Sequence, residues 1–107
     1  MNIHPIPLAY IRAMVERIEQ GSFEACGGRE VKMTLTPPAT PDDAEVLRVY
    51  HYGALILTIV WYAYGVEVES GHGWSATDQN IINSVLVMYD IPYHTVRKDN
   101  VITVMTC

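Results

Sequence analysis

The sequence predicts an α+β domain with a mainly antiparallel sheet of about five strands and two helices. Three observations support this prediction. Apolar residues recur at helical spacing in two separate segments, segments rich in Val, Ile, Tyr and Trp fill the middle of the chain, and turn signals separate neighbouring strand-like segments. Helices separated by strands that turn back on one another are typical of helices packed on one face of an antiparallel sheet. With 107 residues, the chain fits a single domain spanning residues 1–107.

The composition excludes several classes of protein. Hydrophobic residues make up 50% of the chain and charged residues only 18%, which excludes an intrinsically disordered protein. Seven Lys and Arg against twelve Asp and Glu leave a formal net charge of -5. This acidic balance argues against a general nucleic-acid binder, which needs a cationic surface. Two cysteines are too few for a disulfide-rich scaffold or a four-cysteine zinc site.

The N-terminal segment lacks the charge pattern of a secretory signal. The longest apolar run of the chain, Ala54 to Tyr64, is too short to cross a bilayer as a helix. We therefore expect a cytoplasmic protein that makes no membrane contact, with Cys26 and Cys107 both reduced.

The first third of the chain predicts one helix and one strand. Apolar residues spaced by three and four positions predict a helix over about 7–20, which Gly21 follows. Residues 21–28 have the composition of a loop, and alternation over 31–35 predicts a short half-buried strand. Residues 36–43 contain three prolines, so we expect an exposed loop there.

The middle of the chain predicts three strands, over about 46–52, 55–64 and 66–69. The strand over 55–64 is apolar on both faces, with Tyr62 and Tyr64 on one face and Trp61 on the other. A helix layer covers only one of these faces. The second face must therefore be met by the second helix, by the proline-rich loop or by another protein chain.

A second helix and a hairpin complete the predicted order α-β-β-β-β-α-β-β. Ser75 and Thr77 can both cap the helix, and Asp78 follows Ser75 at the spacing of a capping box. The helix should end near Asp90, because Pro92 disfavours helical geometry in the residue before it. The last two strands alternate on either side of Asp99-Asn100, a plausible two-residue turn.

Five groups of residues resemble a diffuse group of short, uncharacterised bacteriophage and prophage proteins. The matching residues are Tyr50-His51, Ser70-Gly71-His72-Gly73-Trp74, Thr77, Ile82-Asn83 and Lys98-Asp99-Asn100. The resemblance covers roughly residues 50–104 and implies a phage or prophage origin with a host-directed or phage-lifecycle role. The group often has a basic helix face where this chain has Asp78-Gln79-Asn80, and this difference argues against an inherited nucleic-acid role.

The loop Gly71-His72-Gly73-Trp74 allows two interpretations. Free N–H groups at the start of a helix can bind an anion, and the sequence allows such a site over Gly71–Thr77. Alternatively, the glycines permit a sharp turn between strand and helix, and Trp74 fills the core. The second interpretation is the simpler one. His51, His72 and His94 could in principle bind zinc, but without a closely spaced pair we expect no metal and no cofactor.

Candidate catalytic groups are weak. Cys26 could act as a nucleophile beside His4 or His51, although nothing in the spacing brings them together. Glu67 and Glu69 lie on one face of a strand, and a solvated strand face explains them more simply than a catalytic pair. We therefore expect no enzymatic activity.

The leading functional hypothesis is an acidic protein-protein interaction domain. The partner would be a host protein, including one that binds nucleic acid, or a second copy of the chain in a homodimer. Small acidic phage proteins of this kind include inhibitors of host defence such as anti-CRISPR proteins. Two further hypotheses are a nucleic-acid-associated phage accessory protein that uses the Gly71–Thr77 loop, and a small metal- or anion-dependent enzyme. The candidate interaction residues are Tyr62, Tyr64, Glu67, Glu69, His72, Trp74 and Asp78.

Overall fold

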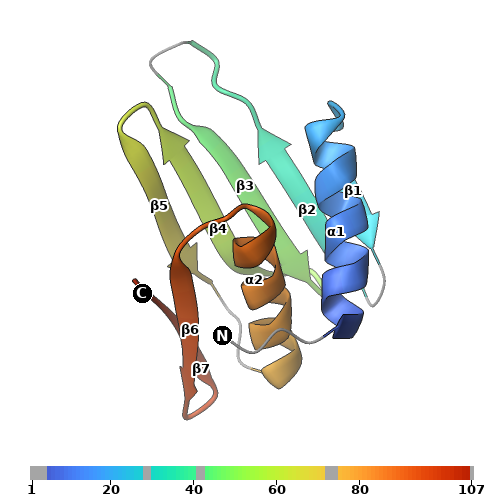
Figure 1. Cartoon of the computed structure of the whole chain (residues 1–107), viewed down its shortest axis with the longest axis vertical. Coiled ribbons are helices and arrows are strands. Elements are labelled where there is room, and N and C mark those ends of the chain that lie inside the picture. Colours follow the sequence, from blue (N-terminus) through green and yellow to red (C-terminus); the bar gives the residue numbers. More distant parts are fainter. Residues whose placement is uncertain (1–4, 28–29, 41–42, 72–74, 107) are drawn as a thin grey trace.

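The protein is an α+β domain, as predicted (Figure 1). The computed structural model describes residues 5–27, 30–40, 43–71 and 75–106. Their elements, in chain order, are α1 (Pro5–Glu19), β1 (Glu24–Gly27), β2 (Val31–Thr36), β3 (Glu45–His51), β4 (Ala54–Tyr62), β5 (Gly65–Ser70), α2 (Ala76–Met88), β6 (Tyr93–Lys98) and β7 (Val101–Thr106). No helix in these ranges is long and apolar enough to cross a membrane.

Five strands form one antiparallel sheet in the order β1-β2-β3-β4-β5, so each strand pairs with its neighbour in the sequence. The helices α1 and α2 lie side by side, point in the same direction and cover one face of this sheet (Figure 1). Strands β6 and β7 form a separate two-stranded sheet beside β5. The fold therefore has two layers, with the core between the helices and the sheet.

The core is built from the predicted apolar positions. The helix α1 buries one stripe of residues spaced by three and four positions, as an amphipathic helix should. The helix α2 is more deeply buried, since each residue from Ile81 to Leu86 is inaccessible or nearly so. The sheet contributes the alternate residues of its central strands. The main apolar members are Ile11, Met14, Val15, Ile18, Val31, Met33, Leu47, Val49, Leu57, Ile59, Ile81, Ile82, Val85 and Leu86.

One strand was missed by the sequence analysis. Residues 24–27 form β1 and pair with β2, although residues 21–28 had the composition of a loop. The physical reason is close packing by α1. A Cβ atom on Gly27 would lie 2.4 Å from the Met14 sulfur, and Ala25 is the only buried apolar side chain of the strand. Small residues let the helix approach, and they also remove the apolar alternation by which a strand is recognised.

The hairpin turns follow the sequence closely. Asp99 and Asn100 both have positive φ, as the two central residues of a type I′ turn require. Tyr52 and Gly53 have the same property and join β3 to β4. The strand predicted over 55–64 ends at Tyr62, because β5 already begins at Gly65 and the chain must turn between them.

The β6–β7 hairpin is attached to the rest of the domain by polar contacts on two sides. The Ser70 hydroxyl at the end of β5 donates a hydrogen bond of 2.7 Å to the Ile102 carbonyl. The Thr95 hydroxyl donates one of 2.7 Å to the Asn83 side chain of α2. Ile102 is buried as well, so the hairpin packs against the main domain and is not a free arm.

Candidate functional site

The second face of the five-stranded sheet is covered by neither helix. Both helices pack on the face that carries Leu47, Val49 and Ile59, so the alternate side chains of the same strands point the other way. The second helix is therefore not the cover that the two-faced strand β4 needs. We call this second surface the open face. Its side chains include Lys32, Thr34, Val46, Arg48, Tyr50, Thr58, Val60, Tyr62, Glu67 and Glu69.

The cations of the open face already have partners. The Lys32 ammonium lies 3.1 Å from a Glu24 carboxylate oxygen, and this hydrogen bond to Glu24 raises the pKa of Lys32 above its ordinary value. The Arg48 guanidinium donates a hydrogen bond of 3.3 Å to the Thr36 hydroxyl. The ion pair with Glu24 compensates the charge of Lys32, whereas Arg48 keeps its positive charge because a hydroxyl carries none.

The opposite corner of the open face is aromatic and acidic. The rings of Tyr62 and Tyr64 are stacked, with centroids 5.1 Å apart and planes 8° from parallel. The Tyr62 hydroxyl donates a hydrogen bond of 3.4 Å to a Glu67 carboxylate oxygen, and Glu69 lies two residues farther along the same face of β5. We call these four residues, Tyr62, Tyr64, Glu67 and Glu69, the acidic-aromatic corner.

The charge of this corner is not compensated. Within the described ranges, no Lys or Arg nitrogen lies within 4.0 Å of the Glu67 or Glu69 carboxylate. The pKa of Tyr62 is raised, mainly because of partial desolvation and also because of the neighbouring Glu67. Tyr64 is 82% exposed. An exposed aromatic stack beside two unpaired carboxylates is a feature of interaction surfaces.

The structure thus brings together four of the seven predicted interaction residues. His72 and Trp74 lie outside the described residues. Asp78 does not belong to this surface, because it is only 4% exposed and lies in α2, on the helix side of the sheet. Its prediction as an interaction residue was wrong because the buried carboxylate accepts hydrogen bonds from other residues of the same chain.

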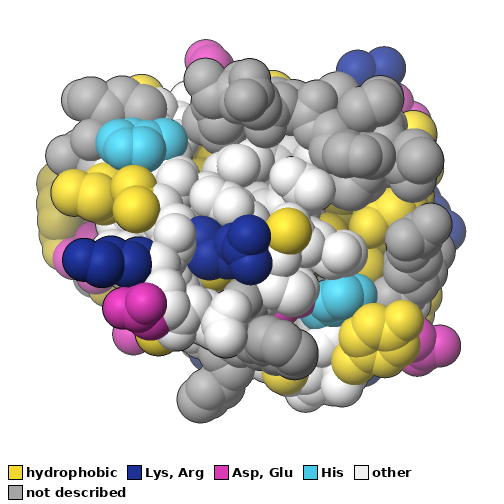
Figure 2. All heavy atoms as spheres, turned by 90° about the horizontal axis from the view of Figure 1, so that it is seen from below, with side chains coloured by type: hydrophobic (Ala, Val, Ile, Leu, Met, Phe, Trp, Pro, Cys, Tyr) yellow, Lys and Arg dark blue, Asp and Glu magenta, His cyan; other side chains and the backbone are white. Residues whose placement is uncertain are grey.

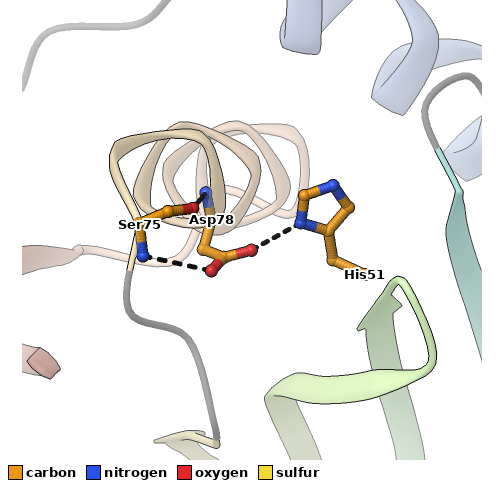
Figure 3. A network of polar contacts seen from close by, with 3 residues as sticks. All are labelled: His51, Ser75 and Asp78. Atoms are coloured by element: carbon orange, nitrogen blue, oxygen red, sulfur yellow. Dashed lines mark hydrogen bonds and ion pairs between the residues drawn. The ribbon is translucent and has the colours of Figure 1, made fainter. Parts of the chain in front are cut away.

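Asp78 forms a polar network with Ser75 and His51 (Figure 3). One carboxylate oxygen accepts a hydrogen bond of 3.1 Å from the Ser75 N–H, and the Asp78 N–H donates one of 3.0 Å to the Ser75 hydroxyl. This is the predicted capping box. The other carboxylate oxygen lies 2.6 Å from Nδ1 of His51 on β3. This second contact joins residues far apart in the sequence, and no local pattern indicated it.

The His51–Asp78 pair resembles part of a catalytic dyad, but its surroundings favour a structural role. His51 is only 8% exposed, and its Nε2 is inaccessible and has no hydrogen-bond partner among the described residues. A general base must reach the proton that it removes, and this nitrogen has no access to a substrate. Cys26 points from the open face, whereas His51 points to the helix side, so the two do not form a nucleophile and base.

An anion site at the start of α2 is also disfavoured. The N-terminus of a helix attracts anions through its free N–H groups and its dipole. Here the Asp78 carboxylate already occupies this position and accepts the Ser75 N–H. A phosphate group would be repelled by this carboxylate, which weakens the hypothesis of a nucleic-acid-associated protein.

Basic patches and metal clusters are the features that nucleic-acid binding or metal-dependent catalysis would require. Figure 2 views the molecule from below, and the Lys and Arg side chains on this face are scattered and form no continuous patch. In the ranges that the structure describes, no three His, Cys, Asp or Glu residues are grouped to hold a metal ion. These two observations lend no support to nucleic-acid binding through this face or to a metal site among the described residues.

Two of the hollows bear on the candidate site. The larger of these, of about 620 Å³, lies at the β1–β3 end of the open face and includes Lys32, Thr34 and Tyr50 in its lining. The smaller, of about 360 Å³, lies on the helix side of the sheet near Trp61 and Tyr89. Neither includes a residue of the acidic-aromatic corner.

Comparisons with protein-family models, with curated proteins and with solved structures find no match for this chain. Its function is therefore inferred from its own geometry.

Proposed function

We propose that this protein is a non-enzymatic interaction domain whose acidic-aromatic corner binds a basic surface of another protein. One observation carries this proposal: the stacked pair Tyr62–Tyr64 lies beside Glu67 and Glu69, and these carboxylates have no cationic neighbour among the described residues. Tyrosines are enriched at protein interfaces because they bury a large area with little loss of conformational entropy.

Charge determines the kind of partner. A basic surface would pair with both carboxylates and would be attracted over a distance, which speeds association. A two-fold dimer centred on the corner would bring Glu67 and Glu69 of both copies together, and like charges would then oppose the contact. A basic partner of a different sequence therefore fits this corner better than a second copy of the chain.

The resemblance to small phage proteins suggests a narrower version of the proposal. In a phage setting, the partner would be a host protein that uses its basic surface to bind nucleic acid, such as a component of a defence system. An acidic domain on that surface would compete with nucleic acid, as an anti-CRISPR protein of this type would. The acidic corner supports this version by its charge, and the resemblance supports it by the implied phage origin.

A capture experiment with matched variants tests the proposal. Tagged wild-type protein, the double variant Glu67→Lys/Glu69→Lys and the control Glu16→Lys are incubated with lysate of the organism that encodes the chain or its host. Quantitative mass spectrometry then compares the captured proteins. We expect a basic protein that the wild type and the control retain and the double variant loses. If every captured protein is retained equally by all three variants, the proposal is wrong.

A second measurement tests the narrower version with the purified partner. Wild-type protein should displace a labelled nucleic acid from the partner, and the double variant should need at least about tenfold more protein, because opposite charges at an interface become like charges. Light scattering of the protein alone gives its oligomeric state. A wild-type dimer that the double variant weakens would instead identify the corner as a self-association surface and would contradict the proposal.

A further inference from the structure

The smaller hollow lies on the opposite side of the sheet from the open face, near the C-terminal ends of both helices (Figure 1). It has a volume of about 360 Å³, within the range of small-ligand sites. Its lining comes from five elements or their immediate ends and consists of Ile18, Glu19, Leu35, Glu45, Trp61 and Tyr89. We call it the helix-end pocket.

Two aromatic rings form part of the wall of the helix-end pocket. The centroids of Trp61 and Tyr89 are 5.2 Å apart, and their planes are inclined by 57°. Ile18 and Leu35 add aliphatic surface. An inclined pair of ring faces with an apolar lining suits an alkyl chain, and ring faces also attract a cation through their quadrupole.

Two carboxylates complete the lining. Glu19 is the last residue of α1, and Glu45 is the first residue of β3 on the same side of the strand as Leu47 and Val49. In the part of the chain that the structure describes, no Lys or Arg nitrogen lies within 4.0 Å of either carboxylate. Glu45 is half-buried and Glu19 is exposed, so both carboxylates are open to a cation that enters the pocket.

The helix ends add to the negative potential. The C-terminal end of a helix carries a partial negative charge, which basic residues in the last turn commonly offset. The last turn of α2 contains no basic residue. Arg17 offsets this charge in the last turn of α1, and its guanidinium donates a hydrogen bond of 2.6 Å to the Cys26 carbonyl. Two carboxylates and the negative end of α2 therefore meet at one pocket.

The Tyr89 hydroxyl also lacks a hydrogen-bond partner among the described residues, although its oxygen is buried. Burial raises the pKa of Tyr89 to about 12, and the charges of Glu19 and Glu45 add to the effect. Both carboxylates thus act on this phenol oxygen. A positive charge in the pocket would be attracted by both carboxylates.

We propose that the helix-end pocket binds a primary alkylammonium group on an aliphatic stem. The ammonium would lie between Glu19 and Glu45, while the stem packs against the rings of Trp61 and Tyr89 and against Leu35. A free aliphatic amine and a lysine side chain of another protein share this chemistry. This inference does not depend on the proposed function of the acidic-aromatic corner, which lies on the other face of the sheet.

An NMR titration tests the inference. The probes are n-butylammonium chloride, the lysine analogue N-acetyl-lysine methylamide, and neutral 1-butanol, all at matched ionic strength. Both amines should cause saturable shifts of the backbone amide signals of Leu35, Glu45 and Tyr89 and of the Trp61 indole N–H signal. If neither amine causes saturable shifts there, or if butanol binds as tightly as butylammonium, the inference is wrong.

Variants test the role of the carboxylates. Glu19→Gln/Glu45→Gln should weaken butylammonium binding at least about tenfold, because the charge-assisted contacts are lost. Glu16→Gln/Glu24→Gln removes two carboxylates elsewhere and should leave the affinity unchanged. Equal affinity of the two double variants would overturn the proposal. Similar affinity for both amines would support a free amine as ligand, and at least tenfold tighter binding of the lysine analogue would support a protein side chain.

Discussion

Nδ1 of His51 lies 2.6 Å from a carboxylate oxygen of Asp78, so a residue at the end of β3 and a residue in the first turn of α2 are joined inside the protein. Because an ionised carboxylate can only accept hydrogen bonds, Nδ1 donates and Asp78 accepts. Asp78 at the same time completes the capping box with Ser75 (Figure 3). One side chain therefore fixes both the start of α2 and its position on the sheet.

Replacement of Asp78 should destabilise the protein more than loss of the helix cap alone. Asp78→Ala leaves the buried His51 without its partner and removes half of the capping box, so we expect the free energy of unfolding to fall by about 3–5 kcal/mol. Ser75→Ala removes only the hydroxyl of the cap and should cost about 1 kcal/mol. Urea unfolding followed by circular dichroism measures both values. Equal losses for the two variants would show that the His51 contact contributes little.

Reversal of charge at Glu69 should weaken partner binding without loss of stability. Glu69 is exposed and has no ion-pair partner among the described residues, so Glu69→Lys should change the free energy of unfolding by no more than about 0.5 kcal/mol. Its affinity for the captured partner should fall at least about tenfold, mainly at low salt. The control Glu16→Lys makes the same change of charge at an exposed position of α1 and should bind the partner with wild-type affinity. Surface plasmon resonance at two salt concentrations distinguishes these outcomes.

Gly71 should not tolerate a side chain. A Cβ atom there would lie 2.2 Å from the Leu55 carbonyl oxygen, and the Gly71 N–H donates a hydrogen bond of 2.9 Å to the Ile56 carbonyl. Gly71→Ala must shift the backbone of β4 and should cost about 1–3 kcal/mol. Gly65→Ala is the control, because a Cβ atom there meets nothing within 4 Å. A Gly71→Ala protein that unfolds at the same urea concentration as Gly65→Ala would contradict this expectation.

Tyr89 should make stability depend on pH in the alkaline range. Its pKa is about 12 in the folded protein, raised by burial and then by Glu19 and Glu45, against an ordinary 10.0. Above pH 10 the unfolded chain loses this proton first, so the contribution of Tyr89 to stability is complete below pH 10 and is lost as the pH rises towards 12. Tyr89→Phe should remove this part of the decline. Urea unfolding at pH 7, 10 and 11 gives the slopes, and parallel slopes for both proteins would refute the assignment.

Much of the fold was predictable because its signals are local. The capping box of Ser75 and Asp78 and the turn residues Asp99 and Asn100 act within four residues of chain, and the structure contains both. The buried stripe of α1 follows from the helical period. The strand β1 could not be predicted in this way. Its Gly27 has no side chain because Met14 of the helix α1 packs against that position, and this contact joins two different elements.

The acidic-aromatic corner was partly predictable. Alternation along β4 and β5 places Tyr62 on the opposite side from Trp61, and Glu67 on the same side as Glu69. The sequence could not show that both helices pack on one face and leave these residues on the other. Nor could it show that Asp78, an acid like Glu67 and Glu69, is buried against His51.

The sequence by itself determined the fold class, both helices, the hairpin turns and the alternation that separates the two faces of the sheet, because each depends on neighbours within a few residues. Only the tertiary structure decided which of these residues meet. The stacked pair Tyr62–Tyr64 lies at a corner of the face that neither helix covers, and Glu19 and Glu45 line one pocket together with Tyr89. Such contacts join segments that are distant in the sequence, so the spacing of residues within one helix or strand cannot predict them.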